Sequence, residues 1–246
     1  MPFHLWQWET EIGAPSGALA PWREFDVERA VGSVCPWAVT LCNDATAACA
    51  AEFVFGKGWR YRDFFYVFVG AFVGGGLVLN GSLRQGRTGN AGALGSMPVM
   101  AKGNEGAPRQ LIECASIYQL ERRLDSAGVD ASSIWATPEA WPDFGVHLEE
   151  WIEDVASALA YAAAATLAVI DFEAIMIDGA MPAGVRARLT ERTAAIFAGL
   201  DRRGLSDVEI VSGTIGADAR AIGGAALPLI RSYGRDREVL LKDASG

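Results

Sequence analysis

The chain has 246 residues, of which 51% are hydrophobic and 21% charged, and its net charge is −9. This composition excludes a disordered polypeptide, and the length suffices for one large or two small domains with a buried core. The acidic balance argues against a chain that itself binds nucleic acid, because that affinity depends mainly on Lys and Arg at the phosphates.

The cysteines and histidines are too few and too widely spaced to predict a metal site, since zinc ligands recur at short, regular intervals. They are Cys35, Cys42, Cys49, Cys114, His4 and His147. We therefore expect no zinc. The N-terminus shows no secretory signal, so we expect reduced thiols in a cytoplasmic protein.

Two apolar runs, residues 64–79 and 155–170, are each 16 residues long. A spanning helix needs about 20 residues. Both runs are predicted to be core, and no membrane partner is expected.

The first part of the chain predicts short elements. Phe3–Trp8 reads as the end of a strand, Asp26–Val31 as a short helix, and Ala38–Cys42 as a strand. The alanine-rich Ala45–Phe55 favours a helix that Gly56 ends.

The central stretch predicts a glycine-rich hairpin. Apolar strands at Phe64–Val69 and Leu77–Leu79 flank Gly70 and a run of three glycines, Gly74, Gly75 and Gly76. Asn80-Gly81 follows, and Asn-Gly favours a tight two-residue turn. Glycines between strands can aim backbone N–H groups at an anion, or they can simply let two segments cross closely. No Lys-Ser or Lys-Thr follows, which excludes a P-loop.

Asn43-Asp44 stands at the end of one predicted strand and opens the next predicted helix. In an open α/β sheet, ligands gather at the carboxyl ends of strands, so this Asp is well placed for chemistry. The alternative is a helix cap, in which the side chain satisfies free backbone N–H groups.

The second half alternates strands and helices, which favours a layered α/β domain. Ser132–Pro142 is predicted to be a loop. The predicted strands are Met97–Met100, Ala174–Ile177 and Val208–Ser212, and the predicted helices are Leu111–Ala127, Val146–Val169, Gly184–Leu200 and Gly216–Ile230, the last broken near Pro228.

Two segments, VTLCNDATAACAAEFVFG and VGAFVGGGLVLNGSL with the following GRTGNAGALGSMPV, resemble the sugar-binding and phosphate-binding parts of the ROK family of repressors and sugar kinases. The resemblance implies the large lobe of an actin-like ATPase (ribonuclease H-like) fold, a mixed sheet flanked by helices, with the small N-terminal lobe mostly missing. It implies that Asn43 and Asp44 contact a sugar and that Asp44 is the candidate base for phosphoryl transfer.

The same resemblance implies further site residues. Asn90, Gly92 and Glu113 would contact the sugar, and Gly74, Gly75 and Gly76 would contact phosphate. Two segments, Ile175–Met181 and Gly213–Gly224, stand where the family has glycine-rich adenosine contacts.

The chain also departs from the family pattern. Active ROK kinases have a Thr and a small Gly early in the hairpin, where this chain has Ala71 and Phe72. Their sugar-gripping Glu and His are replaced by Ala93 and Ser96, and the segment matching their zinc loop, Gly103–Leu111, holds no cysteine. These losses point away from catalysis.

We predict three parts: 1–30, a remnant of the small lobe; 31–229, the sugar-binding large lobe; and 230–246, a C-terminal tail. The preferred function is the sugar-binding effector domain of a ROK regulator that lacks its helix-turn-helix. One alternative is an ATP-dependent sugar kinase using Asp44, for which alone ATP and Mg²⁺ would be needed; another is an oligomerisation scaffold with no ligand. Expected partners are a small sugar and further copies of the chain, as a homodimer or higher oligomer, with no direct DNA contact.

Overall fold

The computed structural model describes residues 4–10, 13–100 and 107–233. The contacts divide the chain into two compact units, residues 1–44 and 45–246. Each unit is described by itself, and the predicted domain boundaries near residues 30 and 229 stay predictions.

The first unit contains short helical segments. They are η1 (Leu5–Gln7), η2 (Ala20–Arg23) and α1 (Val27–Gly32). The helix predicted at Asp26–Val31 is confirmed, with Asp26 as its cap: the Asp26 carboxylate accepts a hydrogen bond of 2.9 Å from the Arg29 N–H. This is the common role of Asp at a helix start.

The two strands predicted in this unit are wrong. Residues 38–42 have no strand hydrogen bonding, and the described part of Phe3–Trp8 contains the 3₁₀ turn η1 instead. A strand needs a neighbour to satisfy its backbone groups. Among its described residues this unit offers none, and the Leu41 N–H donates to the Glu28 carboxylate at 2.5 Å instead.

The second unit is built on a mixed five-stranded sheet in the order β3-β2-β1-β6-β7. The central strand β1 pairs antiparallel with β2 and parallel with β6, and all its residues are buried. The strands are β1 (Phe64–Val69), β2 (Val73–Leu79), β3 (Ser82–Arg84), β6 (Ala174–Gly179) and β7 (Glu209–Ser212), with a separate pair, β4 (Pro98–Val99) and β5 (Arg109–Gln110).

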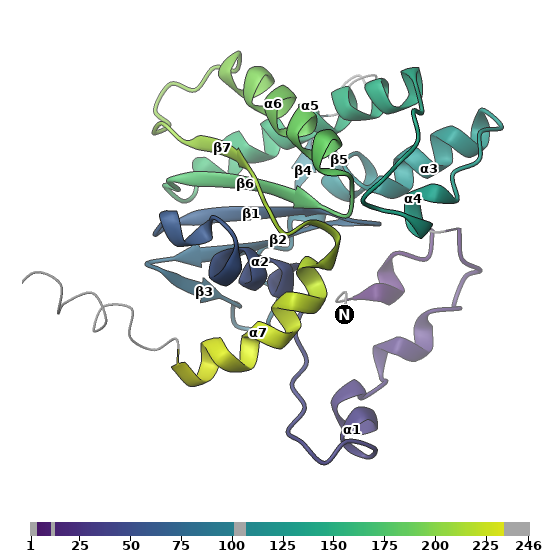
Figure 1. Cartoon of the computed structure of the whole chain (residues 1–246), viewed down its shortest axis with the longest axis vertical. Coiled ribbons are helices and arrows are strands. Elements are labelled where there is room, and N and C mark those ends of the chain that lie inside the picture. Colours follow the sequence, from purple (N-terminus) through teal and green to yellow (C-terminus); the bar gives the residue numbers. More distant parts are fainter. Residues whose placement is uncertain (1–3, 11–12, 101–106, 234–246) are drawn as a thin grey trace, which may run out of the picture. The chain divides into compact units, whose positions relative to one another are not determined.

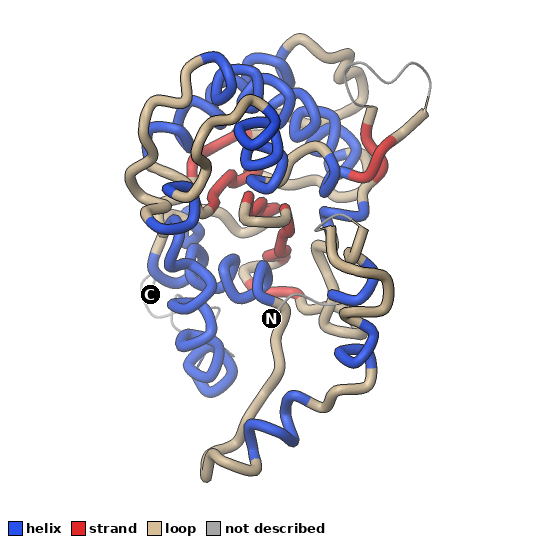
Figure 2. The backbone as a smooth tube through the Cα atoms, turned by 90° about the vertical axis from the view of Figure 1, so that its right-hand side faces the viewer, coloured by secondary structure: helices blue, strands red, loops and turns tan. Residues whose placement is uncertain are grey.

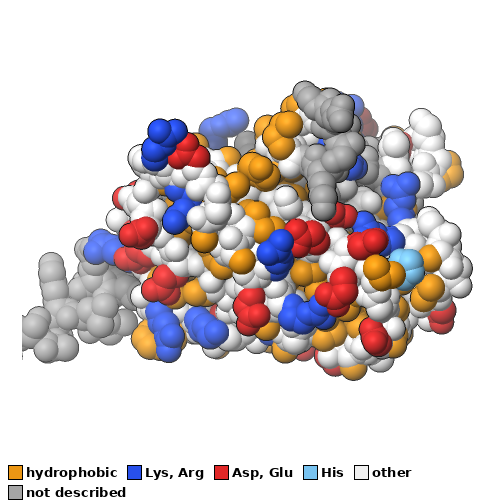
Figure 3. Space-filling model, turned by 90° about the horizontal axis from the view of Figure 1, so that it is seen from above, with side chains coloured by type: hydrophobic (Ala, Val, Ile, Leu, Met, Phe, Trp, Pro, Cys, Tyr) orange, Lys and Arg blue, Asp and Glu red, His pale blue; other side chains and the backbone are white. Residues whose placement is uncertain are grey.

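Helices cover both faces of this sheet (Figures 1 and 2). On one side lie α5 (Val146–Leu167) and α6 (Ala183–Ala198), and on the other α2 (Asp44–Phe55) and α7 (Ala219–Tyr233). The face seen in Figure 3 carries acidic and basic side chains next to one another. Exposed ion pairs link α6 to α5: Arg188 pairs with Glu149, and Arg192 pairs with Glu153.

Several predicted elements are confirmed with small changes. The Asn80-Gly81 turn joins β2 to β3, with both residues at positive φ (54° and 66°), as this tight turn type requires. The predicted loop at Ser132–Pro142 contains one short helix, α4 (Ser133–Ala136). No helix in the described ranges is long and apolar enough to cross a bilayer.

The helix predicted at Leu111–Ala127 is two helices. A 3₁₀ turn, η5 (Leu111–Glu113), precedes α3 (Ile117–Ser126). The break is held by Ser116, whose hydroxyl donates to the Ile112 carbonyl at 2.6 Å and accepts from the Val73 N–H at 3.1 Å. Ser at a helix start favours such local bonds over continued helix.

The break predicted near Pro228 is wrong, because α7 continues through this residue. A proline ring crowds the carbonyl four residues earlier and leaves it without a donor. That residue is Gly224, which is exposed, so water can reach its carbonyl in place of the missing donor.

Candidate functional site

The three consecutive glycines lie inside strand β2, not in a bend between strands as predicted. A Cβ on Gly74 would lie 2.7 Å from the Ala45 Cβ, and a Cβ on Gly76 would lie 2.4 Å from the Cys49 Cβ. Both distances are too short for real carbon contacts. The glycines therefore let α2 lie directly on the strand, which is the close-crossing alternative; their binding of phosphate stays a prediction.

The actual bend between β1 and β2 contains Gly70, Ala71 and Phe72, and helix α3 is fastened to it. The Ile117 N–H donates to the Gly70 carbonyl at 2.9 Å. The Phe72 ring meets the Tyr118 ring edge-on at 6.3 Å between centroids. Ala71 and Phe72, which packs on Tyr118, therefore occupy the positions where the resemblance predicts a Thr and a Gly.

Helix α2 begins at Asp44, directly after Asn43. Both residues are half-buried, and they are the last two residues of the first unit. A carboxylate in the first turn is favoured by the positive end of the helix dipole, whether it serves as a cap or as a base. The role of these two residues in sugar binding stays a prediction.

The loop that contains Asn90 and Gly92 lies on β2. Gly92 has a φ of +78°, and a Cβ there would lie 2.8 Å from the Gly75 carbonyl. Both facts require glycine at this position. Asn90 is half-buried in the same loop. The structure therefore brings the predicted sugar loop against the glycines of β2.

Glu113, the remaining predicted sugar contact, has its carboxylate engaged locally. It accepts from the Gln110 N–H at 3.0 Å and from the Arg109 Nε at 3.2 Å. The bond from Gln110 is part of a capping box at the start of η5, and the bond from Arg109 is an additional ion pair. A sugar hydroxyl at Glu113 would have to share or displace them.

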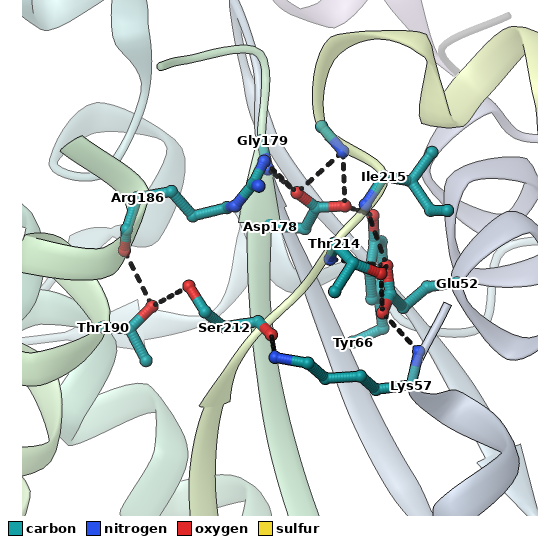
Figure 4. A network of polar contacts seen from close by, with 11 residues as sticks. Glu52, Lys57, Tyr66, Asp178, Gly179, Arg186, Thr190, Ser212, Thr214 and Ile215 are labelled. Carbon is teal, nitrogen blue, oxygen red and sulfur yellow. Dashed lines mark hydrogen bonds and ion pairs between the residues drawn. The ribbon is translucent and has the colours of Figure 1, made fainter. Parts of the chain in front are cut away.

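The parallel strands β1, β6 and β7 end at the same edge of the sheet, each at or just before a glycine. A buried carboxylate, Asp178, lies at this edge, and it was not among the predicted site residues. Asp178 has no exposed surface. It accepts from the N–H groups of Gly179 (2.9 Å) and Gly216 (3.1 Å), from Arg186 Nη1 (3.0 Å) and from the Tyr66 hydroxyl (2.9 Å) (Figure 4). The two predicted adenosine-type segments therefore do meet, and they meet through this side chain.

A second buried carboxylate, Glu52 on α2, binds the adjoining part of the same loop. It accepts from the backbone N–H groups of Lys57 (2.8 Å), Thr214 (2.9 Å) and Ile215 (3.2 Å), and from the Thr214 hydroxyl (3.0 Å) (Figure 4). Three successive amides, 214 to 216, thus point at the protein's own carboxylates. We call Asp178, Glu52 and their partners the carboxylate network. The sequence feature that could have indicated Asp178 is its position directly after the apolar run AIMI, residues 174–177.

Burial sets the protonation behaviour of this network. It raises the pKa of Asp178, against the opposing effects of Arg186, the two amides and Tyr66. Burial and then the Asp178 charge raise the pKa of Tyr66, and burial followed by Glu52 raises the pKa of Cys49. Each raised pKa reflects the cost of placing a negative charge in this buried region.

In the described part of the chain, no three His, Cys, Asp or Glu side chains are grouped so that they could hold a metal ion. The segment that corresponds to the family's zinc loop lies partly outside the described residues, which resume at residue 107.

With this geometry in view, comparison with known proteins identifies the family. Residues 16–229 match the ROK family. The chain belongs to the ROK family. It is 33% identical over 208 residues to the bifunctional enzyme NanE/NanK of Brucella melitensis, a match that covers 83% of this chain but only 38% of that enzyme.

Solved structures show the same fold. A ROK family glucokinase from Streptomyces griseus, in complex with glucose and AMPPNP, superposes with a TM-score of 0.61 at 21% identity, covering 82% of this chain and 71% of that one. A ROK family transcriptional regulator, a homologue of the E. coli MLC protein, gives a TM-score of 0.61 at 21% identity, covering 82% and 55%. The fold is thus the actin-like ATPase fold of ROK proteins, as predicted.

Proposed function

We propose that this ROK protein binds a hexose or an N-acetylhexosamine and phosphorylates it from ATP. The observation that carries the proposal is the 33% identity to NanE/NanK over 83% of this chain. In this chain, the Asn43-Asp44 pair stands at the start of α2. This reverses the preference expressed from the sequence alone, because the kinase relatives support the kinase alternative better.

The chemistry falls to Asp44. Its carboxylate would accept the proton of the attacking sugar hydroxyl while that oxygen bonds to the γ-phosphorus of ATP and ADP leaves. Asn43 would hold a neighbouring hydroxyl through its side-chain amide.

ATP with its Mg²⁺ is a substrate of this reaction, and the carboxylate network does not fit its phosphates. The amides of Gly179, Thr214, Ile215 and Gly216 already bind carboxylate oxygens. These amides are therefore not phosphate contacts in the proposed kinase.

A second candidate is a sugar-binding effector domain without turnover. Two observations favour it. The amides of the carboxylate network already donate to Asp178 and Glu52. The bend contains Ala71 and Phe72, and Phe72 packs on Tyr118. The first candidate predicts sugar phosphorylation, whereas the second predicts sugar binding alone.

One experiment separates the two candidates. The purified chain is titrated calorimetrically with glucose, N-acetylglucosamine and N-acetylmannosamine, and ADP release from ATP is measured with each sugar. We expect Asp44→Asn to lower turnover by about two to four orders of magnitude with little change in sugar affinity. Asp26→Asn is the matched control, because Asp26 caps a different helix.

Each outcome decides something. Sugar binding without ADP release overturns the kinase proposal and supports the effector domain. Unchanged turnover in Asp44→Asn removes Asp44 as the base. Flat calorimetric traces for every sugar, with no ADP release, overturn both candidates.

A further inference from the structure

A cavity of about 390 Å³ lies between α3 and α5, and none of its lining residues belongs to the carboxylate network or to the predicted sugar site except Glu113. Its volume falls in the range of small-molecule sites. Its polar lining includes Arg109, Arg122, Arg123, Gln119, Asp154 and Ser157.

Helix geometry builds the walls of this cavity. On α3, Gln119, Arg122 and Arg123 are three and four residues apart, so they share one face. On α5, Asp154 and Ser157 are three residues apart and face them. The polar lining therefore follows from the helical repeat of two packed helices.

The floor of the cavity is fixed by bonds that lead to the first residue of β2. Trp151 is 1% exposed, and its Nε1–H donates to the Ser116 carbonyl at 3.1 Å. Ser116 in turn accepts from the Val73 N–H through its hydroxyl. A floor held in this way is pre-formed, which reduces the entropy lost when a ligand binds.

The charges in the cavity do not cancel. Arg109 pairs with Glu113 at 3.2 Å, and Arg123 pairs with Asp154 at 2.7 Å. Arg122 has no carboxylate within ion-pair distance in the described part of the chain; its guanidinium lies over the Tyr118 ring at 6.0 Å. One guanidinium therefore remains for a ligand.

Two neutral polar side chains are also available. The Gln119 amide and the Ser157 hydroxyl line the cavity, and neither makes a side-chain hydrogen bond to another described residue. A guanidinium without a carboxylate partner, beside an amide and a hydroxyl, matches an oxyanion attached to a polar, hydroxylated body.

We propose that this cavity binds a small metabolite carrying a phosphate or carboxylate group, with the oxyanion on Arg122 and polar atoms on Gln119 and Ser157. Glu113, a predicted sugar contact, also lines the cavity, but Arg122, Gln119 and Ser157 are not among the predicted sugar contacts, and Asp44 is not a lining residue.

The test is a calorimetric titration of the purified chain at low ionic strength. The probes are glucose 6-phosphate, inorganic phosphate, citrate and, as the neutral control, glucose. Arg122→Gln removes the charge, and Ser157→Phe fills the space while keeping every charge. Arg203→Gln is the matched control, because Arg203 pairs with Asp201 on the surface away from the cavity.

We expect a phosphate or citrate probe to bind to the wild-type chain, Arg203→Gln and Asp44→Asn alike. Arg122→Gln should weaken that binding about tenfold or more, and Ser157→Phe should abolish it. Comparing phosphate compounds with citrate tells a phosphate site from a carboxylate site. The proposal is overturned if no oxyanion probe binds, if Arg122→Gln binds as the wild type does, or if glucose binds as tightly as glucose 6-phosphate. Loss of binding in Asp44→Asn would also overturn it, whereas failure of the kinase assay leaves this result untouched.

Discussion

The carboxylate network and the α3–α5 cavity are both polar regions of the second unit, but they differ in how their charges are satisfied. Around Asp178 and Glu52, backbone amides, Arg186 and Tyr66 all bind carboxylate oxygens that are fully buried. In the cavity, Arg122 and two neutral side chains keep donors and acceptors available. The first region is therefore closed and stabilises the fold, whereas the second is open to a ligand.

The largest effect that this comparison predicts is the loss of the Asp178 carboxylate. Asp178→Ala leaves Arg186, itself only 8% exposed, without its ion-pair partner, and leaves the Gly179 and Gly216 amides unbonded. We expect unfolding free energy to fall by about 3–5 kcal/mol, because an uncompensated buried charge is costly. Urea unfolding followed by circular dichroism measures this.

Asp201→Ala is the control, since Asp201 pairs with Arg203 at a site where both side chains are largely exposed. It should leave the unfolding midpoint unchanged. If Asp178→Ala were as stable as this control, the network would not be a closed structural unit.

A smaller loss is expected when Glu52 is replaced by Gln. One carboxylate oxygen becomes an NH₂ group that cannot accept, so at least one donor among Lys57, Thr214 and Ile215 loses its partner. This should cost about 1–3 kcal/mol. Hydrogen exchange at residues 213–216 should accelerate while exchange in β1 stays slow.

The exposed Glu191 on α6 supplies the matched control, Glu191→Gln, which should change neither quantity. Equal exchange of residues 213–216 in the wild type and Glu52→Gln would mean that Glu52 does not hold this loop.

The sequence predicted most of the fold but little of this network. Apolar runs located β1 and the end of β2, and Asn80-Gly81 located the turn after β2, because local pattern and turn chemistry agree there. Gly74, Gly75 and Gly76 were misassigned, because what requires glycine is contact with α2 and with neighbouring backbone, segments distant along the chain. Asp178 on β6 and Glu52 on α2 bind the same loop, and the local sequence around neither residue predicts this long-range contact.

The pH dependence of stability supplies the smallest prediction. The folded pKa of Asp178 is raised by burial, whereas in the unfolded chain an Asp titrates near about 3.9. Between those two values the folded state binds more of the proton than the unfolded state does. Raising the pH through this window therefore lowers the stability of the wild type relative to Asp178→Asn, by at most about 1.4 kcal/mol per pH unit.

Urea unfolding of the wild type and Asp178→Asn from about pH 4 upward measures that difference directly. Asp201→Asn is the control, because the hydrogen bonds from Arg203 lower the pKa of this exposed carboxyl, which is the opposite direction to the shift of Asp178. A wild-type stability that rises with pH relative to Asp178→Asn would mean that Arg186 and the amides outweigh burial. The folded protein would then stabilise the ionised form of Asp178. In that case the network would resemble the ion pairs Arg109–Glu113 and Arg123–Asp154 of the cavity.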